Sequence, residues 1–387
     1  MRIPRNVFTG WSVVLVLATL LVGVGGSAFS NNLLVWLFGV LVAEIILSFL
    51  FAWLSLVLIS VRRLEMAHGE VGEPLVVRYE VRNRSRWLPA FNIWISERSV
   101  QDKNGWQKRL DGTSAWILNA KARGVCQGEA VYWPHKRGPV LFEKIEITTS
   151  FPFGIFRMRR SHVQSQQCLI HPEVKPLQDR VLKSLAPMGL LGTGFSQQSG
   201  SGDDYYGLRE VGVFQPLRMI AWKVSARREN LVGIEKSLQT RPRLNVVLDL
   251  RTPTNELEVE GHDLKLARKR EEEAITLAAS LLKMAQRNQI DTGLHILGLP
   301  GVDFGLGHGA WHRLRLTAAL AMLDLDEPRR EVSAVPGDFE RAALIVVQCD
   351  LIRPLSGRQD AWYYTASQLS LLIDHGSNQS DSSEEAA

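Results

Sequence analysis

Cysteine is scarce in this chain of 387 residues, and the three that occur, Cys126, Cys168 and Cys349, lie far apart. There is no Cys-x-x-Cys pair, and no histidines accompany them at the spacing of a metal-binding finger. These absences argue against a disulfide framework and against a cysteine-based metal site. They favour reduced thiols in a cytosolic setting.

A strong excess of one charge is also missing, since the formal net charge is +5 and the sequence pI is about 9.1. Such mild basicity allows attraction to anionic lipid or phosphate, but it falls short of a dedicated nucleic-acid-binding protein. No recognition-helix pattern occurs either, so nucleic acid is not expected as a partner. The length exceeds what one hydrophobic core usually serves, which predicts two soluble domains besides any membrane segment.

Two long apolar runs stand at the start of the chain, at residues 11–29 and 33–60. Each reaches the roughly 20 residues that a helix needs to cross a hydrocarbon core. The sequence therefore predicts two transmembrane helices forming a hairpin over residues 1–63. Arginines precede the first run and follow the second, so the positive-inside rule places both ends in the cytoplasm. The expected location is multi-pass in a membrane, with the soluble domains in the cytoplasm and membrane lipid as a partner.

A cleaved signal peptide is the alternative for the first run, because Arg2 and Arg5 resemble its charged region and Ser27-Ala28-Phe29-Ser30 a small-residue cleavage site. The second run would still anchor the chain. Glu44 lies inside that second run, where an ionised carboxylate is costly. It either contacts another membrane subunit or a proton path, or it is a neutral acid bonded to Thr19 or Ser48.

Residues 64–176 show the period-two alternation of strands, most clearly at 75–82, with further strands expected at 91–97, 115–120, 128–133 and 140–148. Short strands at this spacing predict an antiparallel β-sandwich. Five tryptophans fall in this region, and rings of that size are expected in core or rim packing. They are Trp87, Trp94, Trp106, Trp116 and Trp133.

Residues 177–202 are expected to form a linker, because their second half is rich in Gly, Ser and Gln. Gly192-Thr193-Gly194 is not followed by the Gly-Lys-Ser/Thr of a phosphate-binding loop. Strand-like and helical patterns then alternate at 243–250, 263–288, 293–299, 308–323 and 342–348, which predicts a parallel sheet flanked by helices within an α/β domain at 203–375. Residues 376–387 have too little apolar surface to fold and are expected to form a solvated acidic tail.

The most informative segment is residues 202–236, where basic side chains stand among aromatic and small residues; they include Arg209, Arg218, Lys223, Arg227 and Arg228. The composition suits gripping an anion or docking a partner, and it contains no assembled catalytic centre. The candidate site residues here are Arg209, Glu210, Arg218, Trp222, Lys223, Ser225 and Arg227.

This segment and two earlier ones resemble the bacterial domain-of-unknown-function family fifty-eight. The first, residues 151–156, resembles the family's Asp-Pro-Phe-Gly-Leu-Phe turn with Phe151 in place of Asp, and Leu169-Ile170-His171-Pro172 resembles its strand ending in Tyr-Pro. The third is Gly207-Leu208-Arg209-Glu210, then Arg218, Ile220, Trp222-Lys223 and Ser225-Ala226-Arg227. The chain departs from the family at Val211, at Phe214-Gln215 and at Ala221, where a carboxylate or His is common before the Trp.

The resemblance covers most of residues 1–350 and implies a membrane hairpin, a β-domain and a von Willebrand A-like (Rossmann-type) domain. It also implies a bacterial inner (cytoplasmic) membrane as the location. The partners that it implies are a MoxR-type AAA+ ATPase and a transglutaminase-like membrane protein. Domains of the von Willebrand A type bind Mg²⁺ through Asp-x-Ser-x-Ser after their first strand. Here Asp249 is followed by Arg251 and Pro253, so a degenerate site without metal is expected, with Asp249 paired to Arg251 or capping a turn.

Three other patterns have a functional and a structural interpretation. Lys223 and Ser225 suit a Ser-Lys hydrolase only if they share a face, which residues two apart do on a strand and not on a helix. In the structural account, Trp222 packs inward while Lys223 and Arg227 meet carboxylates such as Glu210 and Glu235. His308 and His312 are four apart on an expected helix, which is compatible with metal or with capping.

The third pattern is the cluster of Arg157, Arg159 and Arg160, which either contacts lipid phosphates or ends a solvated strand. Taken together, these features predict a non-enzymatic, membrane-anchored cytoplasmic adaptor or scaffold that needs no cofactor. The alternative is a protein that binds an anion, nucleotide or cell-wall precursor, or an enzyme acting on one, through the basic residues of 202–236.

Overall fold

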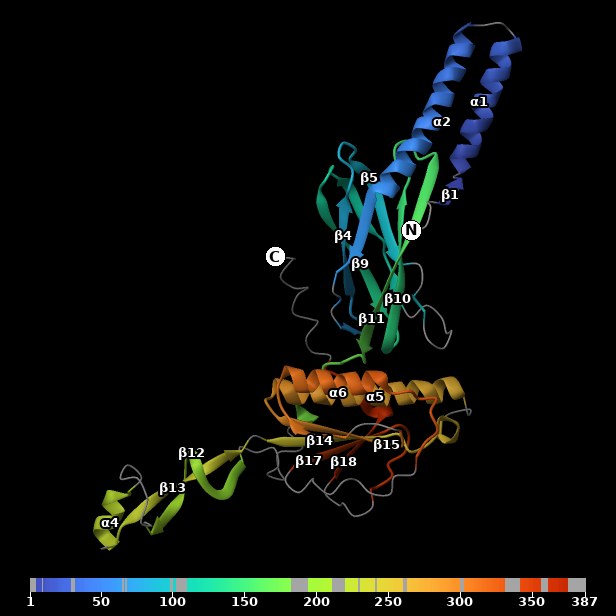
Figure 1. Cartoon of the computed structure of the whole chain (residues 1–387). Coiled ribbons are helices and arrows are strands. Elements are labelled where there is room, and N and C mark those ends of the chain that lie inside the picture. Colours follow the sequence, from blue (N-terminus) through green and yellow to red (C-terminus); the bar gives the residue numbers. More distant parts are fainter. Residues whose placement is uncertain are drawn as a thin grey trace, which may run out of the picture. The chain divides into compact units, whose positions relative to one another are not determined.

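The computed structural model describes residues 5–8, 10–28, 32–64, 66, 68–97, 100–101, 110–181, 194–210, 220–228, 230–240, 242–259, 263–299, 303–330, 342–355 and 361–374. The chain divides into two compact units, Met1–His171 and Pro172–Ala387 (Figure 1). Each unit has its own hydrophobic core. The expected acidic tail at 376–387 lies outside the described residues.

The first unit begins with two apolar helices, α1 (Gly10–Ala28) and α2 (Asn32–Leu58). At 1.5 Å per residue, the 27 residues of α2 extend about 40 Å, which exceeds the roughly 30 Å hydrocarbon core. Among the described helices, α2 alone is both long and apolar enough to cross a membrane, whereas α1 is apolar but shorter. The expectation of two spanning helices is therefore supported for one of them.

The expected β-sandwich is present as two sheets of mostly antiparallel strands. One sheet has the order β1-β11-β10-β5-β8, and in it β3 also pairs with β11 and β6 with β10. The other sheet has the order β2-β4-β9-β7. The strands are β1 (Arg5–Phe8), β2 (Ile59–Arg63), β3 (Gly69–Glu70), β4 (Leu75–Asn83), β5 (Ala90–Glu97), β6 (Val100–Gln101), β7 (Leu110–Gly112), β8 (Ala115–Ala120), β9 (Val125–Pro134), β10 (Gly138–Thr149) and β11 (Phe156–His171).

The alternation expected in β4 is confirmed, since Leu75, Val77, Tyr79 and Val81 are all buried while the residues between them face outward. The boundary of the sandwich differs from the expected residue 64. Strand β2 runs directly from the end of α2 and pairs with β4, and β1 pairs with β11. Their partners lie at least 16 residues away, so local periodicity does not reveal where the apolar helix gives way to a strand.

The four tryptophans of the sandwich that the structure describes do not lie in its core. Trp94 and Trp116 pack against each other with ring centroids 5.9 Å apart, and both indole N–H groups donate to the side-chain oxygen of Asn92. Trp87 is 85% exposed, so packing was the wrong expectation there. Trp106 lies outside the described residues.

The second unit contains the expected α/β sheet, with strand order β16-β15-β14-β17-β18. Four strands are parallel, and β16 is an antiparallel edge strand. The elements are β14 (Arg243–Asp249), β15 (Asp291–Leu297), β16 (Phe304–Gly307), β17 (Ala343–Gln348), β18 (Ala361–Thr365), and the helices η3 (Thr254–Glu256), α5 (Leu264–Arg287), α6 (Ala310–Met322), η5 (Ala366–Gln368) and α7 (Leu369–Leu372).

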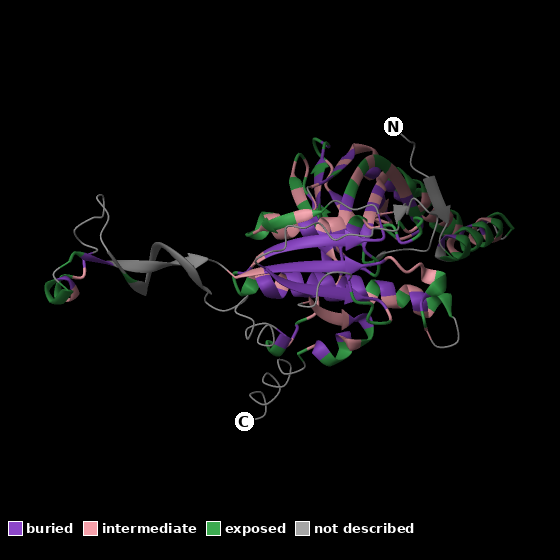
Figure 2. Cartoon of the chain, turned by 90° about the horizontal axis from the view of Figure 1, so that it is seen from below, coloured by how far each residue is buried: buried purple, intermediate pink, exposed green. Residues whose placement is uncertain are grey.

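Helix α5 is the main covering element of this sheet. The side chain of Asp263 caps it by accepting from the Lys265 amide, and its Ala- and Leu-rich stripe is buried. Buried side chains of α5 and α6 join those of β14, β15 and β17 in one core, and Figure 1 shows both helices on the same face of the sheet. The central strands are buried along almost their whole length (Figure 2).

The expected linker partly belongs to the α/β unit. Leu177 forms a β-bridge with Ile373, and Val181 is buried in the core of this unit. Strand β12 (Gly194–Glu210) begins before residue 202, while residues 182–193 lie outside the described part. The bridging partner of Leu177 stands at the far end of the chain, which explains why composition alone suggested a free connection.

Candidate functional site

The signature segment at 202–236 folds as a hairpin with a short helix between its strands. Strand β12 pairs antiparallel with β13 (Val232–Thr240), and Arg209 stands opposite Gly233 in the ladder. Helix α4 (Trp222–Arg228) follows Ile220, which bridges Gly233. The side chains of Arg209 and Glu210, and Arg218 altogether, lie outside the described residues.

Ser225 connects α4 to β13. Its side chain is buried, it accepts a hydrogen bond from the Val232 amide at 2.9 Å, and its hydroxyl lies 3.1 Å from the Ala221 carbonyl and 3.3 Å from the Val232 carbonyl. A hydroxyl held in this way satisfies backbone groups of two elements at once. Ser225 therefore fixes the orientation of the helix on the hairpin.

The opposite side of α4 is open. Trp222 is 60% exposed, and Lys223 and Arg227 are exposed one helical turn apart. The expected inward packing of Trp222 is therefore wrong, because Ser225 takes the inward position. The described residues provide no ion-pair partner for Lys223 or Arg227. We call Trp222, Lys223, Ala226 and Arg227 the α4 surface.

The helical conformation also bears on the Ser-Lys interpretation. Residues two apart on an α-helix point about 200° apart, so Lys223 and Ser225 lie on different faces of α4. The ammonium faces outward, and the hydroxyl is engaged with Val232. This arrangement does not pair a nucleophile with its base.

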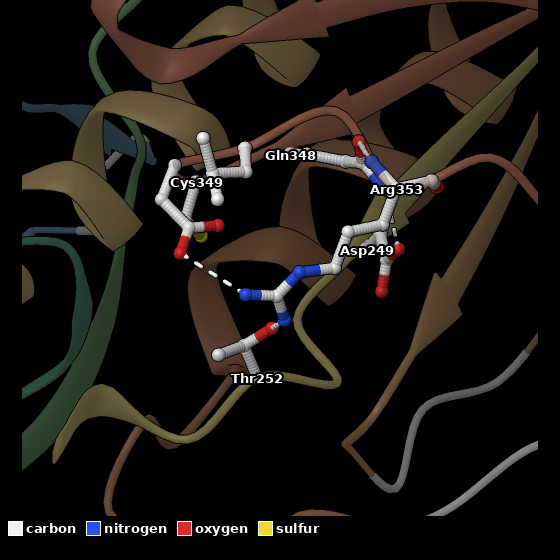
Figure 3. Close-up of a pocket in the computed structure, with 7 residues that line it drawn as sticks. Asp249, Thr252, Gln348, Cys349 and Arg353 are labelled. Atoms are coloured by element: carbon white, nitrogen blue, oxygen red, sulfur yellow. Dashed lines mark hydrogen bonds and ion pairs between the residues drawn. The ribbon is translucent and has the colours of Figure 1, made fainter. Parts of the chain in front are cut away.

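The second candidate position lies at the C-terminal ends of β14 and β17. Strand order reverses between these two strands, and in open α/β sheets the crevice at such a reversal is where ligands bind. Asp249 ends β14, and Gln348 ends β17 directly beside it. Together with Thr252, Cys349, Asp350, Leu351 and Arg353, they line a small hollow (Figure 3). It has room for about one water molecule, whereas small-molecule sites usually occupy roughly 300–1,000 Å³.

Arg251 holds the carboxylate of Asp249 from one side. Its Nε donates to Oδ1 at 2.9 Å and its Nη2 to Oδ2 at 2.8 Å, while the Gln348 amide donates to Oδ2 at 2.9 Å. The expected pairing of Asp249 with Arg251 is confirmed. Burial by itself favours the neutral carboxyl, but the hydrogen bonds from Arg251 and Gln348 outweigh it, and the pKa of Asp249 is lowered.

The other polar side chains that line the hollow form hydrogen bonds with one another and with its backbone. Gln348 exchanges hydrogen bonds with the backbone of Arg353, whose guanidinium contacts Thr252 and Asp350 (Figure 3). Within the described residues, no group of three or more His, Cys, Asp or Glu side chains has the geometry to hold a metal ion. The chemistry available here is thus a bonded network of carboxylates and guanidinium groups.

The two histidines expected on one helix face are separated by the helix start. Helix α6 begins at Ala310, so His308 precedes it, and the ring of His308 lies 3.8 Å from the carboxylate of Asp291. His312 is on α6, and its Nε2 lies 2.7 Å from the Thr292 carbonyl oxygen. The expectation that both histidines lie on one face of a helix is therefore wrong.

A buried carboxylate near the hollow was not anticipated from the sequence. Glu271 on α5 is fully buried and accepts hydrogen bonds from Thr254, Arg268 and Arg329. Burial raises the pKa of Glu271, and the arginines and Thr254 oppose that shift only in part. Nothing in the helical pattern of 263–288 indicated that Glu271 is buried, because two of its partners, Thr254 and Arg329, lie outside the helix.

Cys349 is buried, burial raises the pKa of its thiol, and all three cysteines are free as expected. The basic cluster at the start of β11 is largely used inside the first unit. Arg159 pairs with Glu146 at 2.7 Å. Arg160 donates to the carbonyl oxygens of Leu56, Val57 and Ile59, the last at 3.3 Å, and so caps the C-terminus of α2.

No protein-family model matches the chain, and a search of curated proteins finds no match either.

Proposed function

We propose that the chain is a membrane-anchored cytoplasmic adaptor that docks a MoxR-type AAA+ ATPase and acts beside a transglutaminase-like membrane protein. The observation that carries the proposal is the α4 surface. An exposed tryptophan flanked by two exposed cations, on a helix fixed from behind by Ser225, is the composition of an interface anchor. The identity of the ATPase follows from the family that the signature segment resembles.

Membrane anchoring by a helical hairpin is supported by the topology of the first unit. Strand β1 precedes α1 and β2 follows α2, and both strands belong to the sandwich. A chain that leaves the sandwich through one helix and returns through the other crosses a bilayer twice or not at all. Close approach of the helices agrees with this, since a Cβ added at Gly23 would lie 2.8 Å from the Phe38 ring. The arginines at both ends favour a cytoplasmic body.

The strand order of the second unit, with an antiparallel edge strand next to β15, supports the von Willebrand A-like assignment. In such a domain Asp249 would begin the cation site. The Arg251 guanidinium occupies both oxygens of that carboxylate, which favours docking through protein contacts over metal-mediated adhesion.

The test is photo-crosslinking in intact cells from position 226, at the centre of the α4 surface. We expect the crosslinked product to contain an AAA+ ATPase, and we expect Trp222→Ala combined with Lys223→Ala to abolish it. A crosslinker at Val163, which is 63% exposed on β11, is the matched control. Membrane purification that repeatedly yields no ATPase, with wild-type behaviour of the double variant in vivo, would contradict the proposal.

An anion-binding role is the second candidate, favoured by the exposure of Lys223 and Arg227 one turn apart. Pyrophosphate is a suitable probe, because it can bridge two cations at that spacing. If this role is the correct one, pyrophosphate should slow hydrogen exchange at 220–233 in the whole chain, and Arg227→Gln should remove the effect. No change on addition of pyrophosphate would rule this role out.

A further inference from the structure

Three loops of the sandwich gather at the end where α2 enters it. They are residues 83–90, 120–125 and 149–157. The Arg84 amide donates to the carbonyl of Leu58, the last residue of α2, at 2.9 Å. The other two loops join this end through Asn83, whose amide donates to Gly124 at 3.0 Å, and through the ring contact of Phe91 with Phe151 at 4.8 Å.

The depth of these loops along α2 is set by side-chain contacts. Phe156, at the start of β11, packs edge-on against Phe49 of α2 with ring centroids 5.7 Å apart. Arg160, four residues further, caps the helix end at Leu56. The turn at 151–155 therefore reaches back along the helix to about the level of Phe49. Figure 1 shows the loops of the sandwich beside the lower part of α2.

The membrane interface on this side falls at the same level. Trp36 and Trp53 of α2 are both exposed on the helix surface, and they stand 17 positions apart, which is about 26 Å along a helix. Tryptophans at this separation match the two headgroup regions that bound the hydrocarbon core. Trp53 lies between Phe49 and Leu56, and so it stands level with the three loops.

Exposed aromatic side chains project from two of these loops. Trp87 is 85% exposed and Phe153 is 58% exposed. The backbone around Trp87 is held in place, because the Ser85 hydroxyl accepts from the amides of Trp87 and Leu88. The Asn83 side chain donates to the Leu88 and Ala120 carbonyls. A fixed turn thus presents Trp87, so its backbone needs no further ordering when the ring enters an apolar phase.

All charged residues of these loops are basic. Arg84, Arg86, Lys121, Arg123 and Arg157 are exposed, and the three loops contain no Asp or Glu. Among the described residues, none of the five cations has an ion-pair partner. By contrast Arg159 and Arg160, which an isolated reading of the basic cluster would also assign to lipid, are engaged with Glu146 and with the end of α2.

We infer that this end of the sandwich is a lipid-docking surface that lies on the bilayer in which α2 is anchored. Trp87 and Phe153 enter the interfacial layer, and the five cations contact the phosphates of anionic phospholipids. The surface restrains the tilt of the sandwich relative to the membrane. It is separate from the α4 surface, so the two can be tested independently.

The experiment uses the whole chain in nanodiscs, with a nitroxide attached at Trp87→Cys or Phe153→Cys in a Cys126→Ser background. Trp133→Cys is the matched control, since Trp133 is 41% exposed near the opposite end of β9. In discs of phosphatidylglycerol and phosphatidylcholine, we expect the probes at 87 and 153 to be accessible to oxygen and shielded from a water-soluble nickel complex. The probe at 133 should show the reverse.

A second variant tests the charges without touching the aromatic residues. Arg84→Gln, Arg86→Gln, Lys121→Gln and Arg123→Gln together should return the probe at 87 toward water, with each charge shifting the docking equilibrium roughly fivefold. The control variant combines Arg78→Gln with Lys136→Gln and so removes exposed cations elsewhere in the sandwich. It should leave the accessibility of the probe at 87 unchanged. Probes at 87 and 153 that behave like the probe at 133 would overturn the inference. So would shielding that appears only when a partner protein is present.

Discussion

Arg251 grips both carboxylate oxygens of Asp249 at the C-terminal end of β14, with donor–acceptor distances of 2.9 and 2.8 Å. The two residues are two positions apart, and the Arg251 amide lies 3.2 Å from the same carboxylate. Asp249 lies at the crevice where strand order reverses, which is where an open α/β sheet binds ligands. Its carboxylate is therefore already hydrogen-bonded within the protein at that crevice.

Removing that guanidinium should weaken β14. We expect Arg251→Ala to lower the free energy of opening of β14 by about 2 kcal/mol at pH 7, since it leaves a buried carboxylate with fewer charged hydrogen bonds. Hydrogen exchange of the Arg243–Asp249 amides in the whole chain measures it. Lys269→Ala, on the exposed side of α5, is the control.

The same pair should produce a pH dependence of known sign. The pKa of Asp249 is lower in the fold than in the unfolded chain, so its contribution is complete above the ordinary Asp pKa of about 3.9. It is lost as the pH falls through the folded value. The difference between wild type and Arg251→Ala should shrink below about pH 4. A difference that is constant between pH 7 and pH 3 would contradict this assignment.

The contribution of Glu271 to stability should change with pH in the opposite direction. Burial raises its pKa, so the fold binds this proton more firmly, and stability falls as the pH rises from the ordinary Glu value to the folded one. Arg329→Met removes a buried cation beside it and should cost about 3 kcal/mol at pH 7. The cost should be smaller when Glu271→Gln is added, as measured by hydrogen exchange of α5. A double variant as unstable as Arg329→Met alone would show that the unpaired charge of Glu271 does not cause the loss of stability.

The sandwich contains a comparable pair in Arg63 and Glu97, both with fully buried side chains. Arg63 comes from β2 and also donates to the Gln164 carbonyl of β11, so it links the two sheets. Glu97→Ala should lower the free energy of opening of β2 and β5 by about 3 kcal/mol, because it leaves a buried guanidinium without its partner. Arg63→Met with Glu97→Leu should be milder, and exchange at Ile59–Arg63 reports both.

Ser225→Ala tests the anchoring of α4. Losing the hydrogen bond to Val232 should loosen the helix by about 1 kcal/mol and speed exchange at 221–232. Because the α4 surface depends on this placement, crosslinking from position 226 should fall while the exposed residues remain. Asn230→Ala, at an exposed position of the same connection, is the control. Unchanged exchange would mean that Ser225 does not position the helix.

Local periodicity was sufficient for most of the regular elements. The alternation at 75–82 predicted β4, and the apolar stripe and Asp263 predicted α5, because the residues that define each element are neighbours in the chain. The sequence also indicated the partner of Asp249, since Arg251 lies two residues away. Each of these inferences depends on contacts within one element or one turn.

Contacts between distant residues were decided by the tertiary structure. The burial of Ser225 depends on β13. The ion pairing of Glu271 depends on Arg329, which lies 58 positions later in the chain. The pairing of Ile59–Arg63 within the sandwich depends on β4. The outward position of Trp222 follows from the first of these contacts. No local pattern encodes such pairings, because the free energy that selects them comes from burying several elements together. The amino-acid sequence alone thus determined the classes of element and the apolar helices, and folding decided which charges are paired inside and which are exposed.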